Sequence, residues 1–228
     1  MTFVFCHVGP DAVIPTILVR SLRRHNPGAV IVQCSDEDTQ DIPEADETIR
    51  VPDAGMMAMR LRGFAEVEGP AMFLDADMIC RKPINVEALL GDNDVMVCRR
   101  SRGNAAHIRP RGLRIDVSEY WDRTYGDVYP YLACTTIASA AFWRDCLANL
   151  RTLDAKFQDW FGDQEAIRNV VNAGEYKVGE LSERDFAFTP DMTQGDPAFI
   201  HFKGRHKHTM IGTAILDGLI DADLARIS

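Results

Sequence analysis

The sequence lacks the features that mark a membrane-spanning or a disulfide-bonded secreted protein. No segment approaches the run of about 18 apolar residues that a membrane helix needs, and residues 1–13 contain no basic stretch followed by a long apolar core. The six cysteines form no CxxC pair and no spacing typical of a zinc site. We therefore expect a soluble, cytoplasmic protein without an integral membrane segment, in which the cysteines are buried, reduced thiols.

Positive charge is also scarce. The chain has 25 Lys and Arg residues against 34 Asp and Glu residues, which gives a net charge of -9. This balance argues against duplex nucleic acid or an anionic membrane as an indiscriminate partner. The chain has no internal repeat, low-complexity tract or linker. Its 228 residues, of which 46% are hydrophobic, are enough for one large core. We therefore expect a single domain over residues 1–228.

Strand-like and helix-like segments alternate along the first half of the sequence. A strand expected over 2–8 is followed by a helix over 11–25 and a strand over 29–35, and a second helix over 54–68 precedes an apolar strand over 71–79. This order predicts an α/β fold with a Rossmann-like, mixed but mostly parallel central sheet flanked by helices. Further strands are expected over 48–51, 94–99 and 131–137 and around 176 and 199, with helices over 141–153 and 163–173.

The strand over 71–79 carries two carboxylates one residue apart, Asp75 and Asp77. Because side chains alternate across a strand, we expect both to point the same way. Two aligned carboxylates repel each other unless a cation or hydrogen-bond donors offset their charge. In open α/β sheets, ligands bind where strands end at their carboxyl side. The pair therefore predicts a site for a hard divalent cation.

A second candidate segment follows the short apolar strand around residue 199, which delivers His201. Gly204 and Lys207 come after it at three-residue intervals. The imidazole can complete a coordination shell, the glycine lets the backbone approach a ligand closely, and the ammonium can neutralise phosphate oxygens. The imidazole also favours Mn²⁺ over Mg²⁺, although Mg²⁺ remains an alternative. Together the two segments indicate a metal-bound diphosphate.

Three motifs together resemble those of the retaining family 8 glycosyltransferases, which include glycogenin and the bacterial lipooligosaccharide galactosyltransferases. Residues 73–77 (FLDAD) are similar to the family's DxD motif, residues 162–164 to its GDQ element, and residues 201–207 (HFKGRHK) to its HxxGxxK element. The resemblance implies the GT-A, nucleotide-diphospho-sugar transferase fold. It also implies a metal-dependent, retaining hexosyltransferase that uses a nucleotide-sugar, with UDP as the expected nucleotide, and an unknown acceptor.

The resemblance also implies the parts of the donor site. Asp75, Asp77 and His201 would hold Mn²⁺, which bridges the two phosphates of the donor. Residues that would contact the donor nucleotide and its diphosphate are Val8, Arg60, Asp75, Gly204 and Lys207. The physics agrees, because breaking the glycosidic bond leaves negative charge on the nucleoside diphosphate, which a fixed divalent ion and Lys207 would stabilise.

The catalytic pair implied by the resemblance is Asp163, which would bind hydroxyls of the donor sugar, and Gln164, which would lie near the anomeric carbon. Gln164 is a poor nucleophile, so it fits front-face displacement through an oxocarbenium-like state. The sequence departs from the family's motifs at two places near the expected donor site. The family's Asn-x-Gly is replaced within the sequence of residues 131–137, which leaves the donor sugar open, and the Pro-Trp that follows the last lysine is replaced by His208-Thr209.

One stretch of this acidic chain is basic. Between Arg99 and Ile115 there are six arginines and His107, without an acidic residue: Arg99, Arg100, Arg102, Arg109, Arg111 and Arg114. We hypothesise that this Arg99–Arg114 loop covers the active site and recruits an anionic acceptor, such as a phosphorylated glycan. The alternative is a solvated, mobile loop.

Other functions stay open. A catalytically inactive nucleotide-sugar-binding or carbohydrate-binding protein of the same fold would keep the site without turnover. A haloacid-dehalogenase-like phosphatase also ends an apolar strand with DxD, but normally near the start of the chain, whereas here the motif follows residue 70. A nucleotidyltransferase would normally show a Gly-rich N-terminal loop, for which residues 7–10 (HVGP) are a weak candidate.

Overall fold

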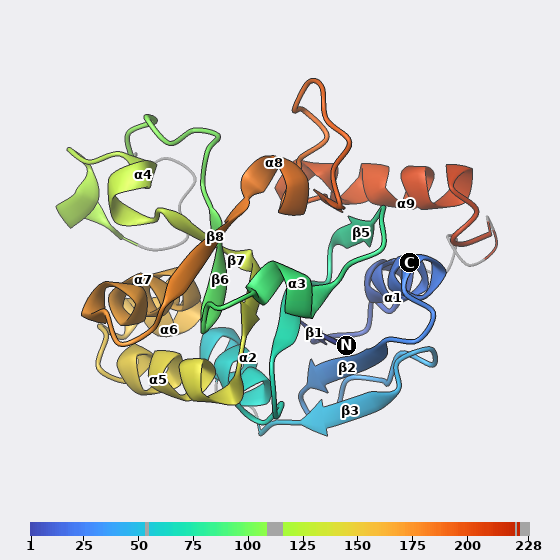
Figure 1. Ribbon diagram of the computed structural model, residues 1–228, viewed down its shortest axis with the longest axis horizontal. Coiled ribbons are helices and arrows are strands. Elements are labelled where there is room, and N and C mark those ends of the chain that lie inside the picture. The colour runs from blue at the N-terminus through green and yellow to red at the C-terminus, as the bar shows by residue number, and fades with distance from the viewer. Residues whose placement is uncertain (53–54, 109–115, 222, 224–228) are drawn as a thin grey trace.

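The computed structural model describes residues 1–52, 55–108, 116–221 and 223. Its centre is a seven-stranded sheet with the order β3-β2-β1-β4-β7-β6-β8 (Figure 1). Four neighbouring strands are parallel: β3 (Glu47–Arg50), β2 (Val30–Ser35), β1 (Thr2–Cys6) and β4 (Ala71–Asp75). Next to them β7 (Tyr131–Ala138) is antiparallel to both of its neighbours, while β6 (Val95–Arg99) and β8 (Val178–Ser182) are parallel to each other. The predicted α/β class is confirmed.

Helices cover both faces of this sheet because its central strands are apolar on both. Along β4, Leu74 faces one side and Phe73 the other. The face of the sheet that carries Leu74 packs against α1 (Val13–His25) and α3 (Val86–Leu90). The face that carries Phe73 packs against three helices: α2 (Met56–Ala65), α5 (Ala140–Leu150) and α7 (Gly162–Ala173).

A second, smaller sheet pairs β5 (Met78–Cys80) antiparallel with β9 (Phe199–His201). Two helices, α1 and α9 (Lys207–Leu216), close a small core over it that contains Ile17, Ile79 and Met210. This sheet brings the DxD segment next to the segment that carries His201, although the two are far apart in the sequence (Figure 1).

The prediction of one continuous strand over 71–79 is wrong. β4 ends at Asp75, Ala76 and Asp77 form a turn, and β5 begins at Met78. The turn transfers the chain from the large sheet to the small one, so the alternation of a single strand is not what orients the two aspartates. Their common orientation comes instead from the partner strand, because Met78 pairs with His201.

The long helices agree with the sequence patterns, and each begins and ends within three residues of the predicted bounds. Helix α9 and several short helices were not predicted: α3, α4 (Tyr125–Val128), α6 (Lys156–Asp159), α8 (Glu183–Phe186) and the 3-10 helices η1 (Ser118–Tyr120) and η2 (Gly204–His206). The prediction of one domain is not tested by this arrangement and stays a prediction.

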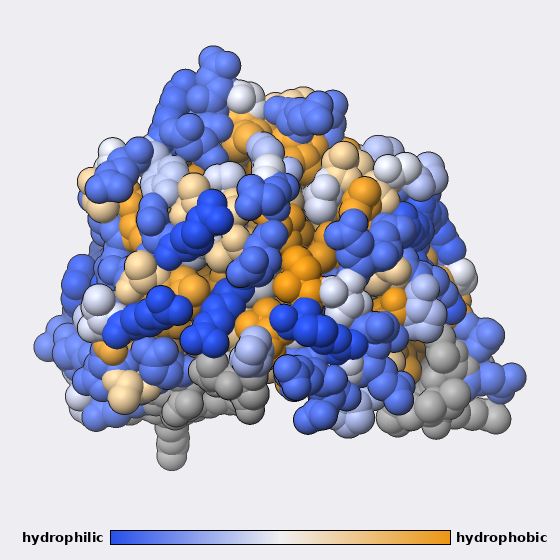
Figure 2. Space-filling model, turned by 90° about the horizontal axis from the view of Figure 1, so that it is seen from below, coloured by the Kyte–Doolittle hydropathy of each residue, from blue (hydrophilic) through white to orange (hydrophobic). Residues whose placement is uncertain are grey.

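The surface is mainly polar on the side of α2, α5 and β3, where hydrophilic residues surround smaller apolar areas (Figure 2). All six cysteines are free thiols, and five of them are buried as predicted, whereas Cys6 is only partly buried. Among the described residues, no helix combines the length and the hydropathy needed to cross a membrane. The cytoplasmic location stays a prediction.

Candidate functional site

The predicted metal ligands converge at the carboxyl end of β4. Oδ2 of Asp75 lies 3.5 Å from Nε2 of His201, and Oδ1 of Asp77 lies 3.2 Å from the same nitrogen. His201 is buried, and neither of its ring nitrogens makes an aligned hydrogen bond within the described part of the chain. Ligands bound at about 2.1 Å and at right angles on one ion lie about 3 Å apart. Each carboxylate therefore lies at a distance from the imidazole that two ligands of one divalent cation can have, while the group whose ligand atoms all lie within 4.8 Å of one another is Asp75, Cys134 and His201, without Asp77.

The electrostatics of these groups depend on their neighbours. Nζ of Lys207 lies 3.3 Å from Oδ2 of Asp77. Burial opposes ionisation of Asp77, but His201 and Lys207 outweigh it and lower the pKa of Asp77 to about 2. Burial likewise works against a charged His201, yet Cys134 and Asp77 raise its pKa to about 10. A metal ion that binds here must therefore displace a proton from the imidazole.

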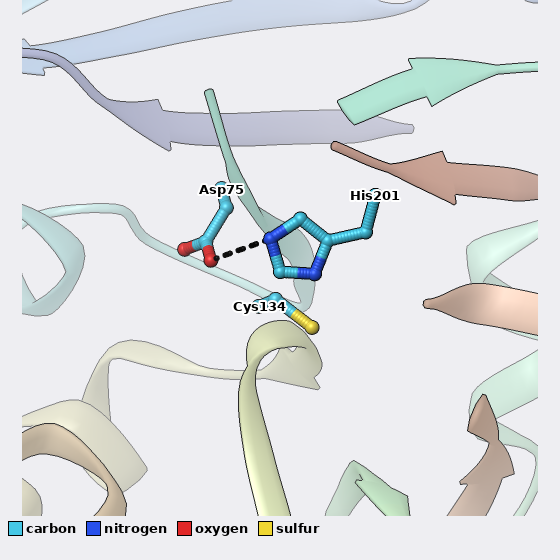
Figure 3. Close-up of side chains that lie close together, drawn as sticks. All are labelled: Asp75, Cys134 and His201. Carbon is cyan, nitrogen blue, oxygen red and sulfur yellow. Dashed lines mark ion pairs between the residues drawn. The ribbon is translucent and has the colours of Figure 1, made fainter. Parts of the chain in front are cut away.

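Cys134 of β7 is a third neighbour of His201 that the sequence did not identify. Ligand atoms of Asp75, Cys134 and His201 all lie within 4.8 Å of one another. Figure 3 shows Asp75 at the Nε2 side of the ring and the sulfur of Cys134 beneath its Nδ1 side. The Cys98 thiol and His201 lower the pKa of the Cys134 thiol against the effect of burial.

Arg60 of α2 joins two segments of the predicted site. Its Nη2 lies 2.7 Å from Oδ1 of Asp75 and its Nη1 lies 3.0 Å from Oδ2 of Asp163. Nη2 also donates to the carbonyl of Ala133 over 2.7 Å. Burial alone would lower the pKa of Arg60, but Asp75 and Asp163 together raise it. Burial raises the pKa of Asp163, and Arg60 opposes this rise. Arg60 thus compensates the buried Asp163 and the partly buried Asp75.

The GDQ element begins α7 under tight steric constraints. Phe161, just before the helix, has φ 61, a conformation that is uncommon for a residue other than glycine, and its ring stacks on Tyr129 at 5.0 Å. A Cβ atom on Gly162 would lie 2.0 Å from the carbonyl oxygen of Phe157. Such strained backbone is typical of functional sites. Two residues after Gly162, the amide oxygen of Gln164 accepts a hydrogen bond of 3.1 Å from Nη2 of Arg100.

The remaining predicted donor-binding residues lie at the same end of the sheet or on η2 and α9. Gly204 has φ 60 and begins η2, so the glycine is needed for a left-handed backbone, and Lys207 begins α9. Val8 is half-buried and follows β1 by two residues. Because Cys6, the last residue of β1, pairs with Asp75, Val8 lies at the edge that carries the aspartates.

The basic stretch is described only in part, since Arg109, Arg111 and Arg114 lie outside the described residues. Of its other arginines, Arg99 pairs with Glu180 at 3.4 Å and Arg102 pairs with Asp191 at 2.6 Å. Arg100 holds Gln164, as described above. Two of these side chains, Arg100 and Arg102, line a cavity of about 320 Å³ beside the site.

Comparisons with solved structures identify glycosyltransferases of similar fold. The bifunctional glycosyltransferase WbbM matches with a TM-score of 0.56 and 16% identity over 90% of this chain, which spans 46% of the WbbM chain. An active-site mutant of LgtC matches with a TM-score of 0.53 and 13% identity. The match covers 93% of this chain and 96% of the LgtC chain. The glycosyltransferase GlyE of Streptococcus pneumoniae TIGR4 matches with a TM-score of 0.53 and 14% identity over 96% of this chain, which spans 64% of the GlyE chain.

The sequence itself gives a different result. No protein-family model and no curated protein matches the chain. At the identities above, likeness of structure indicates the fold and not the reaction. The chain therefore has the GT-A type of glycosyltransferase fold.

Proposed function

We propose that the protein is a metal-dependent, retaining hexosyltransferase that takes a sugar from a UDP-sugar. The observation that carries the proposal is the convergence of Asp75 and Asp77 on Nε2 of a buried His201 at 3.5 and 3.2 Å. Mn²⁺ is the proposed ion because the set combines hard carboxylates with an imidazole. Bound there, the ion would act as a Lewis acid toward the diphosphate.

Each residue of the donor site has a proposed task. Lys207, whose ammonium faces Asp77, would turn to the diphosphate and offset the charge that develops on the departing group. Gly204 would let the backbone approach the phosphates, and Val8 would contact the nucleotide at the edge of the sheet. Arg60, whose Nη2 lies 2.7 Å from Oδ1 of Asp75, would orient that carboxylate. These tasks need a site from which water is excluded, and the burial of His201 supports this.

Asp163 and Gln164 are the proposed catalytic pair. Asp163 would bind hydroxyls of the donor sugar, and Gln164 would lie beside the anomeric carbon. In the transfer, the bond from the anomeric carbon to the diphosphate oxygen breaks and a bond to the acceptor hydroxyl oxygen forms on the same face. The hydroxyl proton passes to the departing nucleoside diphosphate. Because the amide oxygen of Gln164 accepts a hydrogen bond from Arg100, it is a weak nucleophile, which supports front-face displacement over a covalent intermediate.

Hydrolysis of UDP-sugars tests this proposal without knowledge of the acceptor. A panel of UDP-hexoses is incubated with the full chain and Mn²⁺, and release of UDP is measured. We expect release from at least one donor, loss of it with EDTA, and a loss of at least about 100-fold in Asp77→Asn, because one ligand of the ion is weakened. The matched control Asp145→Asn changes an exposed aspartate on α5 and should leave the rate unchanged.

The alternatives give other outcomes in the same assay. An inactive binding protein would bind a UDP-sugar in the presence of Mn²⁺ but release no UDP with any donor. A phosphatase would release phosphate from a phosphate monoester and not depend on a nucleotide-sugar. Release of UDP that persists in Asp77→Asn at the wild-type rate would contradict the assigned site.

A further inference from the structure

The cavity next to the candidate site has a cationic lining. Its volume of about 320 Å³ is within the range of small-molecule sites. Four of its side chains carry a positive charge and two carry a negative charge: Arg100, Arg102, Lys203 and Arg205 against Glu183 and Asp191. This excess is opposite in sign to the net charge of -9 of the whole chain. The lining is therefore a local departure from the composition of the protein.

The two negative charges are already satisfied by the protein. Oε2 of the buried Glu183 accepts hydrogen bonds from the backbone N–H groups of Ser101 and Arg102, at 2.7 and 2.6 Å. Asp191 lies 2.6 Å from Arg102, 3.6 Å from Arg205 and 3.4 Å from Nε2 of His206. One carboxylate thus faces two guanidinium groups, those of Arg102 and Arg205, so positive charge remains available for a ligand.

Lys203 is the least committed of these cations. It is exposed, and its ammonium makes no ion pair with a carboxylate of residues 1–52, 55–108, 116–221 or 223. The guanidinium of Arg205 is likewise mostly exposed and only loosely associated with Asp191, at 3.6 Å. Both side chains can reorient toward a bound anion at little cost. They lie two and four residues after His201, so the cavity borders the segment that carries the imidazole.

One residue that lines the cavity also contacts the proposed catalytic residue Gln164. Arg100 lines the cavity and donates to Oε1 of Gln164 over 3.1 Å. A group that binds in the cavity therefore lies on the side of Gln164 that Arg100 occupies. A second cavity of about 310 Å³ shares Arg102 and Asp191 with the first and adds Arg184 and Gln194. The two cavities together can take a ligand larger than one sugar.

We propose that this cavity binds an oxyanion on the acceptor, a phosphate or a carboxylate, and so holds an acceptor hydroxyl toward Gln164. The inference rests on the proposed function, since it names the acceptor class of that same site. Lysine and arginine side chains bind phosphate and carboxylate through charge-assisted hydrogen bonds. The acceptor would accordingly be an anionic sugar or glycan, and the neutral form of the same sugar would bind poorly.

Calorimetry with the full chain tests the inference without turnover. Glucose, glucose 6-phosphate and glucuronate are titrated separately, without donor and with EDTA. We expect at least one anionic sugar to bind about tenfold more tightly than glucose. Stronger binding of glucose 6-phosphate indicates a phosphate and stronger binding of glucuronate a carboxylate, and either result supports the proposal. Equal affinities, or no binding of either anionic sugar, would overturn it.

Variants locate the effect. Lys203→Gln combined with Arg205→Gln should lower the affinity for the anionic sugar about tenfold and leave the affinity for UDP with Mn²⁺ unchanged. The matched control Lys177→Gln removes an exposed lysine just before β8 and should change neither affinity. If the double variant still binds the anionic sugar more tightly than glucose, or if its affinity for UDP falls instead, the cavity is not an acceptor site. Absence of UDP-sugar hydrolysis alongside an intact anion preference would instead count against the proposed function alone.

Discussion

Nη1 of Arg60 lies 3.0 Å from Oδ2 of Asp163, a residue 103 positions later in the chain. The same guanidinium contacts Asp75, so one buried cation connects the GDQ helix to the end of the central strand β4. Arg60 therefore fixes Asp75, a proposed metal ligand, relative to Asp163, a proposed catalytic residue.

Replacing Arg60 should accordingly affect stability as well as activity. Arg60→Met leaves the buried Asp163 and the partly buried Asp75 without this cation, and we expect a loss of roughly 3 kcal/mol in the free energy of unfolding. Urea denaturation measures this change in the free energy of unfolding. The control Arg144→Met breaks an exposed contact of 4.0 Å with Glu68 and should cost less than about 0.5 kcal/mol. Equal stabilities of the two variants would show that the Arg60 bridge is not important.

Cys134 should act on the metal ion through His201. A metal-bound histidine depends on the group that faces its other nitrogen, and loss of such a partner typically weakens metal binding by about 10-fold or more. We therefore expect Cys134→Ala to weaken Mn²⁺ binding by about that factor, measured from free Mn²⁺ by electron paramagnetic resonance. Cys146→Ala, the same truncation in the buried core of α5, is the control. Wild-type Mn²⁺ affinity in Cys134→Ala would remove Cys134 from the site.

The affinity for Mn²⁺ should depend steeply on pH. Because the pKa of His201 is raised to about 10, the imidazole of the metal-free protein is protonated at neutral pH and must lose that proton on binding. Below the raised pKa, the affinity should increase about tenfold for each pH unit, from about pH 6.5 to about pH 8. A histidine with an ordinary pKa of 6.5 would instead give an affinity that levels off above about pH 7.

The glycine that opens the GDQ helix should not tolerate a side chain. In Gly162→Ala, the new Cβ would meet the Phe157 carbonyl oxygen at 2.0 Å and Leu150 at 2.5 Å. We expect a loss of about 3 kcal/mol in stability, together with loss of activity, since Gln164 shifts with the helix. Gly212→Ala in α9 meets nothing within 4 Å and should stabilise the protein by about 0.5–1 kcal/mol. Thermal unfolding of both variants provides the comparison.

How much of this site the sequence predicts depends on the range of the interactions. The DxD and HxxGxxK segments are predicted as candidates because their residue types and spacing are local signals of metal and phosphate chemistry. The structure brings Asp75 and Asp77 near His201, and a turn at Ala76 and the pairing of Met78 with His201 place them there, not the alternation of one continuous strand. A turn inside an apolar run leaves no trace in hydrophobic periodicity.

The contacts made by Cys134 and Arg100 could not be predicted because they are tertiary. A cysteine in an apolar strand resembles a core residue, and only the register of β7 beside β4 brings Cys134 to His201. Helix α9 was missed for a local reason. Its sequence, KHTMIGTAIL, contains four β-branched residues and a glycine, which lower its helix propensity.

The most direct test of the central claim is the binding of UDP to the full chain with and without Mn²⁺, measured by calorimetry in the wild type and in His201→Ala. The three-ligand site of Asp75, Asp77 and His201 predicts tight binding of UDP only when Mn²⁺ is present, and loss of that dependence in the variant. Binding of UDP that is equally tight without Mn²⁺, or Mn²⁺ dependence that persists in His201→Ala, would contradict it.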